Sequence, residues 1–240
     1  MSMTIPTWMG ISLSLLSNFD AFQDYDYLAK NPHLWEETGR QSWTAPLELL
    51  HGLPSTKGLE RAQIMGQISS YMWDNHRVRN GDDLKARLYD LLDNPSETCL
   101  SFENIRSKIR GCSFNVREQM LTNLKGKPEY DNYLIVNEYD LLIPLTGIRA
   151  YDFANASALC RLGMYQSMIS EDEGNNWLQA IWNSTCKSYT NVEQFALSSA
   201  VGLLFENQGS RYEDILRRYY NALHHPQGYW SNLEWTPSLI

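Results

Sequence analysis

The stretch "SMISEDEGNNWLQAIW", residues 167–182, decides the fold class because it can be interpreted in two ways. Its consecutive carboxylates, Glu171, Asp172 and Glu173, could form a metal-binding or catalytic cluster, or they could mark the start of a helix. Ser170 and Glu173 have capping-box spacing, in which each side chain satisfies the other residue's backbone N–H. Acids in the first turn also suit the positive end of the helix dipole. Adjacent helical side chains point about 100° apart and do not converge on one ion. We therefore interpret this stretch as a helix start.

The same start pattern recurs along the chain. Thr190 and Glu193, then Ser210 and Glu213, have the spacing of Ser170 and Glu173, and residues 94–97 form an Asn-Pro-Ser-Glu version. Starts at intervals of twenty residues predict helices of roughly 14 residues joined by short loops, which favours antiparallel packing of neighbours.

Apolar residues recur at helical spacing elsewhere as well, whereas alternating β-branched runs are almost absent. The helical stripes are Ile64, Met65, Ile68, Tyr71 and Met72; Leu84, Leu88, Leu91 and Leu92; and Tyr212, Ile215, Leu216, Tyr219, Tyr220 and Leu223. The run "NYLIVNEYDLLIPL", residues 132–145, is apolar enough for a buried helix or a buried strand. We favour a helix that ends near Pro144, because proline disfavours helix continuation.

These patterns predict an all-α protein with one compact multi-helix domain over residues 1–240, short loops, and room for a minor strand pair. The charge balance changes near 125–130, where a loose subdomain boundary is conceivable. Hydrophobic residues make up 43% of the chain and include 8 Trp and 14 Tyr, which is ample apolar area for a core.

The net charge of −8 argues against a phosphate backbone as the partner, so we expect no nucleic acid. The charge is uneven: residues 77–127 are mildly basic, and residues 128–240 are acidic. The basic part is interleaved with carboxylates, which favours a solvated mixed surface over a docking face for an acidic partner.

The N-terminal sequence predicts a cytoplasmic protein without a membrane anchor. Residues 9–16 are apolar but too short to cross a bilayer, and no basic residues precede them as in a signal peptide. The cysteines, Cys99, Cys112, Cys160 and Cys186, form no C-x-x-C and have no zinc-like spacing with histidine. We expect reduced thiols, no metal and no cofactor.

A polar group within an otherwise apolar helix is the candidate functional site. In "IRAYDFANASALCRLGM", residues 148–164, Asp152 would be costly to bury unpaired, and Asn155 is within its reach. One interpretation is a buried Asp that satisfies nearby backbone or an arginine. The other is a functional polar site of Asp152, Asn155, Arg161 and Glu173, although Asp152 and Arg161 face nearly opposite sides of one straight helix.

The tail "GYWSNLEWTPSLI" supplies a candidate interface through Trp230 and Trp235. Exposed aromatics of this kind anchor protein interfaces. Terminal aromatics more often pack back on their own domain, so a core role is the competing interpretation.

Residues 148–206 resemble the bacterial YbeU/YbeR-type family of unknown function. The matching positions lie in "AYDFANASALCRLGMYQSMISEDEGNNWL" and in "NVEQFALSSAVGLLF", and they are Ala150, Tyr151, Asp152, Arg161, Gly163, Ile169, Ser170, Glu173, Trp177, Glu193, Phe195 and Gly202. The chain departs from the family pattern at Asn155, Val192 and Leu203, where the family has Arg, Trp and Arg. The resemblance implies no activity. It does imply, as association only, a partner of the J-domain or Hsp70 chaperone type.

Three functions remain open from the sequence. No nucleotide-binding, zinc-protease or serine-hydrolase motif occurs. We therefore expect a non-catalytic protein–protein interaction module rather than an enzyme. The alternatives are an enzyme or small-ligand binder with a polar inter-helix pocket around Asp152, and an immunity-type protein that neutralises a toxin through its acidic C-terminal half.

Overall fold

The structure is a computed structural model of the 240-residue chain, and it describes residues 2–4, 10–17, 19, 42–44, 51, 53, 57–224, 230 and 235. Helices dominate this part, which confirms the all-α prediction. The α-helices that lie wholly within residues 57–224 are α5 (Gly58–His76), α6 (Gly81–Asp93), α7 (Glu97–Arg110), α8 (Phe114–Leu124), α9 (Tyr130–Tyr139), α10 (Arg149–Tyr165), α11 (Glu171–Ser188), α12 (Val192–Glu206) and α13 (Tyr212–His224). No helix among these described residues combines the length and the apolar character needed to cross a membrane.

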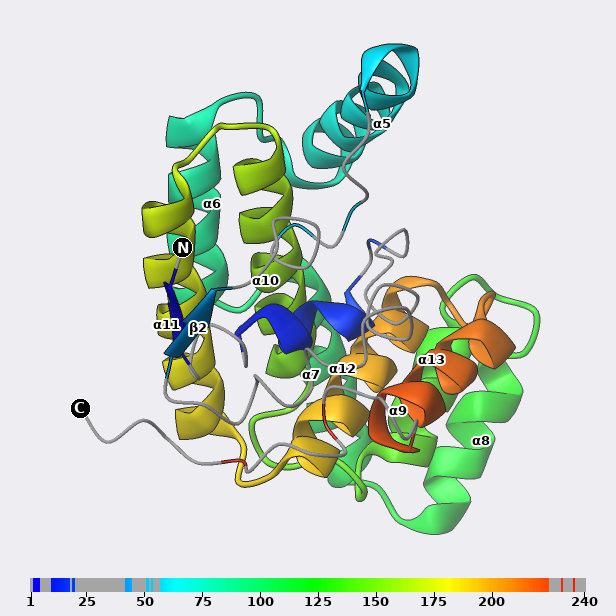
Figure 1. The fold of residues 1–240 in the computed structure, drawn as a ribbon. Helices are drawn as coiled ribbons and strands as arrows, with labels where there is room; N and C mark the ends of the chain where they lie inside the picture. Colours follow the sequence, from blue (N-terminus) through cyan, green and yellow to red (C-terminus); the bar gives the residue numbers. More distant parts are fainter. Residues whose placement is uncertain are drawn as a thin grey trace.

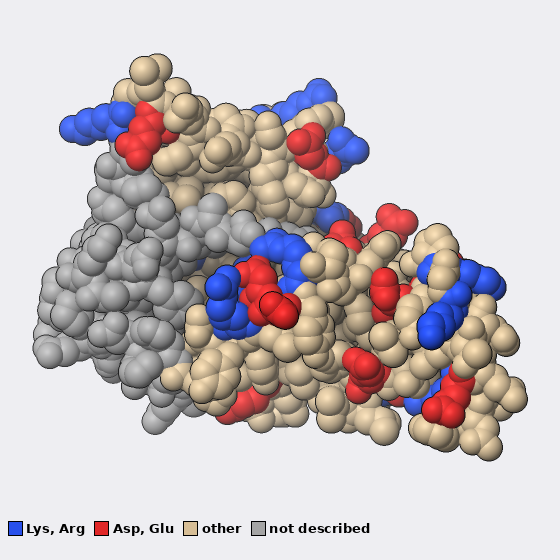
Figure 2. All heavy atoms as spheres, turned by 90° about the vertical axis from the view of Figure 1, so that its right-hand side faces the viewer, with Lys and Arg blue, Asp and Glu red and all other residues tan. Residues whose placement is uncertain are grey.

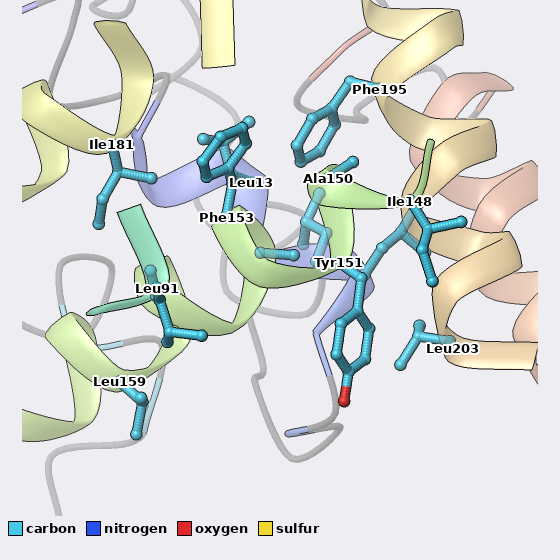
Figure 3. Packing of buried hydrophobic residues seen from close by; sticks show 14 of the residues in the cluster. Leu13, Leu91, Ile148, Ala150, Tyr151, Phe153, Leu159, Ile181, Phe195 and Leu203 are labelled. Carbon is cyan, nitrogen blue, oxygen red and sulfur yellow. The ribbon is translucent and has the colours of Figure 1, made fainter. Parts of the chain in front are cut away.

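Helix α10 forms the centre of the molecule. Every residue from Ala150 to Tyr165 is buried, which its many Ala, Ser and Gly residues permit because small side chains allow close helix approach. In Figure 1, α6 and α11 lie beside α10, and α12 with α13 lies on its other side. The hydrophobic cluster around α10 includes side chains from α6, α11 and α12 (Figure 3). The polar candidates on α10 are therefore surrounded by packed helices.

A short segment near the N-terminus also lies in this core. Residues 10–17 are all buried and include the 3₁₀ helix η1 (Leu13–Leu16). Figure 1 shows η1, in blue, crossing the middle of the molecule, where it contacts α10, α12 and α13. Strand β1 (Ser2–Thr4) pairs antiparallel with β2 (Ser42–Thr44), which is the minor strand pair allowed by the sequence.

The predicted capping box is confirmed at α11, whereas the one predicted at residues 94–97 is displaced by two residues. Ser170 accepts from the backbone N–H of Glu173, and the Glu173 carboxylate accepts from the backbone N–H of Ser170, so the capping box is complete. At α7 the predicted cap, Asn94, is wrong: Asn94 ends α6, and Ser96 caps α7 by accepting from the backbone N–H of Cys99. The acidic triplet therefore begins α11, as the opening stretch predicted.

The other two predicted boxes are wrong in detail. At α12 the cap is Asn191, whose side chain accepts from the N–H of Gln194, so Thr190 lies one position too early. At α13 the Ser210 hydroxyl donates to the carbonyl of Asn207 and supports the turn before the helix. Asparagine is as good a cap as serine or threonine, so adjacent candidates make the cap ambiguous from sequence.

The run 132–145 is a helix that ends earlier than predicted. Helix α9 ends at Tyr139, and residues 140–147 form turns before α10. Pro144 lies within these turns rather than at the helix end. The expectation that the whole run is buried is wrong for Leu141, Leu142 and Leu145, which are 85%, 62% and 84% exposed.

The crossing of α10 and α12 gives a first stability prediction. A Cβ added at Gly202 would lie 2.4 Å from Cβ of Tyr151, which is too close for any real contact. Although alanine is favoured over glycine in a helix by about 1 kcal/mol, we expect Gly202→Ala to lower the free energy of unfolding by about 1–3 kcal/mol through overpacking. Urea denaturation measures this change.

Gly66 in α5 is the matched control. A Cβ there meets nothing within 4 Å, and the position is exposed. We expect Gly66→Ala to raise the free energy of unfolding by about 0.5–1 kcal/mol. Two substitutions of equal effect would contradict the close approach of α10 and α12.

Candidate functional site

Asp152, the first predicted site residue, is completely buried. Its Oδ2 accepts from the backbone N–H of Ser96 at 3.0 Å, from the Cys99 thiol at 3.2 Å, and from the guanidinium of Arg149. Ser96 and Cys99 lie at the start of α7, where backbone N–H groups lack partners within the helix. Asp152 therefore satisfies the N-terminus of α7.

Arg149, one turn earlier on α10, serves the end of α6. Its guanidinium donates to the carbonyl oxygens of Leu91, Leu92 and Asn94. These carbonyls belong to the last turn of a helix, which a cation complements. The Arg149–Asp152 ion pair thus binds the carbonyl end of α6 and the amide end of α7 at once, which fixes the turn between them.

The same pair affects the thiol of Cys99. Burial raises the pKa of Cys99 far above the ordinary thiol value, and the Asp152 carboxylate raises it further. A thiolate is the reactive form of cysteine, so this side chain stays a neutral donor to Asp152. The arrangement suits a hydrogen-bonded scaffold.

The remaining predicted polar residues lie in different surroundings. Asn155 is buried and hydrogen-bonded to Tyr151 on the same helix. Arg161 is buried and donates to the hydroxyl of Ser14 at the N-terminal segment. Glu173 lies at the surface, where it caps α11. Among their described contacts, Asp152 points to α7 and Arg161 to η1, so the structure does not bring these residues together.

Glu173 borders an open hollow between α6 and α11. Its Oε1 lies 2.8 Å from Nζ of Lys85, and this pairing with the bonds from Ser170 lowers the pKa of Glu173 to about 2. The hollow has a volume of about 400 Å³, and Tyr89 packs edge-to-face against Trp177 there with ring centroids 4.6 Å apart. The charged residues thus form an ion pair beside an aromatic surface.

The two candidate interface tryptophans pack back on the helices. Trp230 is buried and donates from its indole N–H to the hydroxyl of Ser12. Trp235 donates to the carbonyl of Tyr189 and packs against Trp182 with centroids 4.7 Å apart. Both indoles therefore have partners inside this chain.

A second buried ion pair, which the sequence analysis missed, organises residues 140–147. Asp140 and Arg106 are both buried, with Nε of Arg106 2.7 Å from Oδ1 of Asp140. Burial alone would raise the pKa of Asp140, but the hydrogen bonds from Arg106 and Arg110 outweigh it and hold the pKa below the ordinary value.

Arg106 also fixes the backbone of the following turns. Its guanidinium donates to the carbonyl oxygens of Asp140, Ile143, Pro144 and Leu145, at 3.0–3.5 Å. Irregular backbone needs such partners because its carbonyls lie outside any helix. Arg106 therefore holds residues 140–147 in one shape.

We call residues 140–147 the leucine loop, because they present Leu141, Leu142 and Leu145 to solvent. A single exposed leucine is ordinary on a protein surface, but three within five residues form a concentrated apolar feature. The sequence signal was the apolar run that extends past its helix into Pro144, which was interpreted as buried.

The charged side chains on one face of the molecule are of both signs. Figure 2 shows the face made by the right-hand side of Figure 1, and on it Lys and Arg side chains are interspersed with Asp and Glu. Beside the leucine loop, Glu103 and Arg110 are both partly exposed and of opposite sign. Among the described residues no group of three His, Cys, Asp or Glu side chains could hold a metal ion.

We expect the stability of the protein to depend on pH through His76, which lies at the end of α5. Its Nε2 lies 3.2 Å from the Tyr71 hydroxyl, and burial with the nearby Arg87 lowers its pKa from 6.5 to about 4. The unfolded chain binds the proton more readily, so stability is complete above about pH 6.5 and is lost as the pH falls towards 4. At pH 4.5 we expect protonation of His76 to have lowered the free energy of unfolding by about 2–3 kcal/mol relative to neutral pH.

The measurement compares the wild type with His76→Gln by urea denaturation at pH 7.5 and pH 4.5. Carboxylates that titrate in the same range affect both proteins and cancel in the difference. On acidification, the free energy of unfolding of the variant should fall by about 2–3 kcal/mol less than that of the wild type. Equal losses would show that His76 is not held neutral by the fold.

The comparisons with known proteins identify a family but not a function. A family model described as "Protein of unknown function (DUF1266)" matches residues 72–235. No curated protein and no solved structure matches the chain. The matched residues contain α6 to α13 with both buried ion pairs and the leucine loop. The match gives no link to the YbeU/YbeR-type family, and that resemblance stays a prediction.

Proposed function

The chain belongs to the DUF1266 family of proteins of unknown function, and from that premise we propose that it is a non-catalytic module that binds another protein through the leucine loop. The observation that carries the proposal is the high exposure of Leu141, Leu142 and Leu145 on a backbone that buried Arg106 holds in place.

The energetics favour a partner with an apolar recess. Burying one leucine side chain stabilises a complex by about 1.5–3 kcal/mol, so three supply a substantial contribution to affinity. A stable interface buries about 800 Å² on each partner, so the loop would form its centre and the surrounding mixed charges its rim. The opposite charges of Glu103 and Arg110 suit such a rim.

The fixed shape of the loop lowers the cost of binding. Ordering a flexible loop on association consumes binding free energy, whereas a loop that is already ordered avoids that loss. Arg106 contacts four loop carbonyls and the Asp140 carboxylate, so the ordering is achieved within the folded monomer.

The contacts of the polar candidates support a binding role over catalysis. The carboxylate of Asp152 is buried among donors from α7 and α10, and Asp140 is buried against Arg106 and Arg110. A catalytic acid or base must reach a substrate. These carboxylates instead stabilise helix ends and the loop.

The partner class and the compartment remain part of the proposal. We propose a cytoplasmic protein partner, with a J-domain or Hsp70-type chaperone as the class that the family resemblance suggests. The free thiols of all four cysteines are compatible with a reducing compartment.

The test replaces the exposed leucines with serine. A triple variant Leu141→Ser, Leu142→Ser and Leu145→Ser is compared with the wild type by crosslinking in cells, purification and mass spectrometry. Leu59→Ser is the matched control, because Leu59 is 86% exposed on α5, away from the loop. We expect the wild type and the control to recover the same stoichiometric partner and the triple variant to lose it. A chaperone among the recovered proteins would support the proposed class.

Two outcomes would overturn the proposal. One is recovery of the same partners by the triple variant and the wild type while both have the same melting temperature. The other is leucine-dependent binding to anionic lipid vesicles in a sedimentation assay, because exposed leucines beside basic residues can also enter a bilayer surface.

A further inference from the structure

Residues 10–17 are held in the core by side chains that contact their backbone, and this contact pattern is the starting point. Ser157 on α10 donates to the carbonyl of Gly10 at 2.6 Å. Ser199 on α12 donates to the carbonyl of Leu16 at 2.9 Å. Contacts to backbone carbonyls depend little on the sequence of the segment that supplies them.

Arg218 on α13 completes the binding of the carbonyl end. Its Nη2 lies 2.9 Å from the carbonyl oxygens of both Leu15 and Ser17. The last carbonyls of any short helix lack partners within that helix, and a cation there also complements the dipole. Ser199 and Arg218 therefore recognise the C-terminal end of a short helical segment.

Two further contacts select hydroxyl side chains. Buried Arg161 on α10 donates to the hydroxyl of Ser14, and the indole N–H of Trp230 donates to the hydroxyl of Ser12 at 3.0 Å. In the same segment the side chains of Ile11, Leu13 and Leu16 are completely buried. Figure 3 shows Leu13 within the cluster formed with Phe153, Ile181 and Phe195.

The side chains that contact residues 10–17 lie inside the range matched by the family model, whereas residues 10–17 lie outside it. Ser157, Arg161, Ser199, Arg218 and Trp230 all lie within the matched residues 72–235, whereas residues 10–17 lie before them. The family region therefore supplies a groove of α10, α12 and α13 side chains, and a segment outside that region fills it.

We infer that this groove is a peptide-binding site and that residues 10–17 are its built-in ligand. A partner protein binds there by exchanging with residues 10–17. Its segment has about eight residues, ends in a short helical turn, has apolar residues in place of Ile11, Leu13 and Leu16, and has hydroxyls in place of Ser12 and Ser14. The site is separate from the leucine loop and does not depend on it.

The first experiment opens the groove in the full-length chain. The double variant Leu13→Asp and Leu16→Asp, which we call the opened chain, disfavours binding of residues 10–17 in the groove because two charges would be buried there. A fluorescent peptide of residues 8–18 is added, and its anisotropy is followed. We expect it to bind the opened chain about tenfold or more tighter than the wild type, whose own segment competes at high effective concentration. The peptide should also raise the melting temperature of the opened chain.

Matched controls distinguish binding at this site from nonspecific binding of the peptide. A peptide with the same two Asp substitutions should not bind. Arg218→Met in the opened chain should weaken binding about tenfold or more, because two carbonyl contacts are lost. Arg217→Met should not, because Arg217 is largely exposed and pairs with Asp214. The opened chain that also carries the triple leucine-loop substitution should bind the peptide as tightly as the opened chain itself, so failure of one proposal is distinguishable from failure of the other.

The inference is overturned if the opened chain is folded by circular dichroism and does not bind the peptide. If the opened chain does not fold, hydrogen exchange of the wild type decides. We expect the amides of residues 10–17 to exchange about tenfold or more faster than those of α10, through local release of the segment. If the amides of residues 10–17 and those of α10 exchange only when the whole protein unfolds, residues 10–17 are a permanent part of the core. That result would overturn the inference.

Discussion

Replacing Asp152 with alanine is expected to lower the free energy of unfolding by about 3–5 kcal/mol. The substitution leaves the guanidinium of Arg149, which is only 16% exposed, without its carboxylate. It also leaves the backbone N–H of Ser96 without its Asp152 acceptor, and the thiol of Cys99 keeps only the carbonyl of Ile148. Urea denaturation followed by circular dichroism measures the loss.

The matched control is Asp90→Ala on α6. Arg87 and Asp90 have the same three-residue spacing as Arg149 and Asp152, but Asp90 is 51% exposed. Exposed pairs contribute little, so we expect a change within about 1 kcal/mol. If Asp152→Ala cost no more than Asp90→Ala, the carboxylate would not be a scaffold group, and the interpretation as a functional polar site would gain support.

Replacing Arg106 with methionine is expected to have a similarly large effect, about 3–5 kcal/mol. Methionine keeps much of the side-chain volume but leaves Asp140 buried and removes the donors to the leucine loop. The exchange of residues 141–147 with deuterated solvent should accelerate at the same time, because their carbonyls lose a fixed partner. Partner binding through the loop should weaken with it.

Arg110→Met is the control for this experiment. Arg110 also contacts Asp140, at 2.8 Å, but it is 41% exposed, so water can replace most of its contribution. A loss within about 1 kcal/mol is expected. Adding Asp140→Leu to Arg106→Met should recover part of the loss, since the buried carboxylate that lost its buried partner is then absent. An equal loss of unfolding free energy for Arg106→Met and Arg110→Met would contradict the role of Arg106 in fixing the leucine loop.

The helices were predictable because their signals are local. Leu84, Leu88 and Leu91 are buried on α6 as their spacing indicated, and the box at Ser170 begins α11. Spacing was less informative on α13, where Tyr220 is 63% exposed. Tyrosine counts as apolar in such a pattern, yet its hydroxyl tolerates solvent.

The candidate site was less predictable because its contacts are between distant parts of the chain. The cost of burying Asp152 unpaired was evident from its apolar helix, and the need for a partner followed. Which partner would be found was not evident, since Ser96 lies 56 residues away and Arg106 pairs with a residue 34 positions away. Only the i, i+3 pairing of Arg149 with Asp152 lay within the reach of a local rule.

The burial of residues 10–17 has a consequence for the order of assembly during synthesis. These residues leave the ribosome well before their partners, because their contacts with α10, α12, α13 and Trp230 span 147 to 218 positions of sequence. The segment must therefore wait, with its leucines uncovered, until α10, α12, α13 and Trp230 have emerged. Contacts of such long range slow folding, and apolar surface exposed meanwhile invites aggregation. A nascent chain stalled before α12 would display that surface, and it would need a chaperone at a stage when the finished molecule would not.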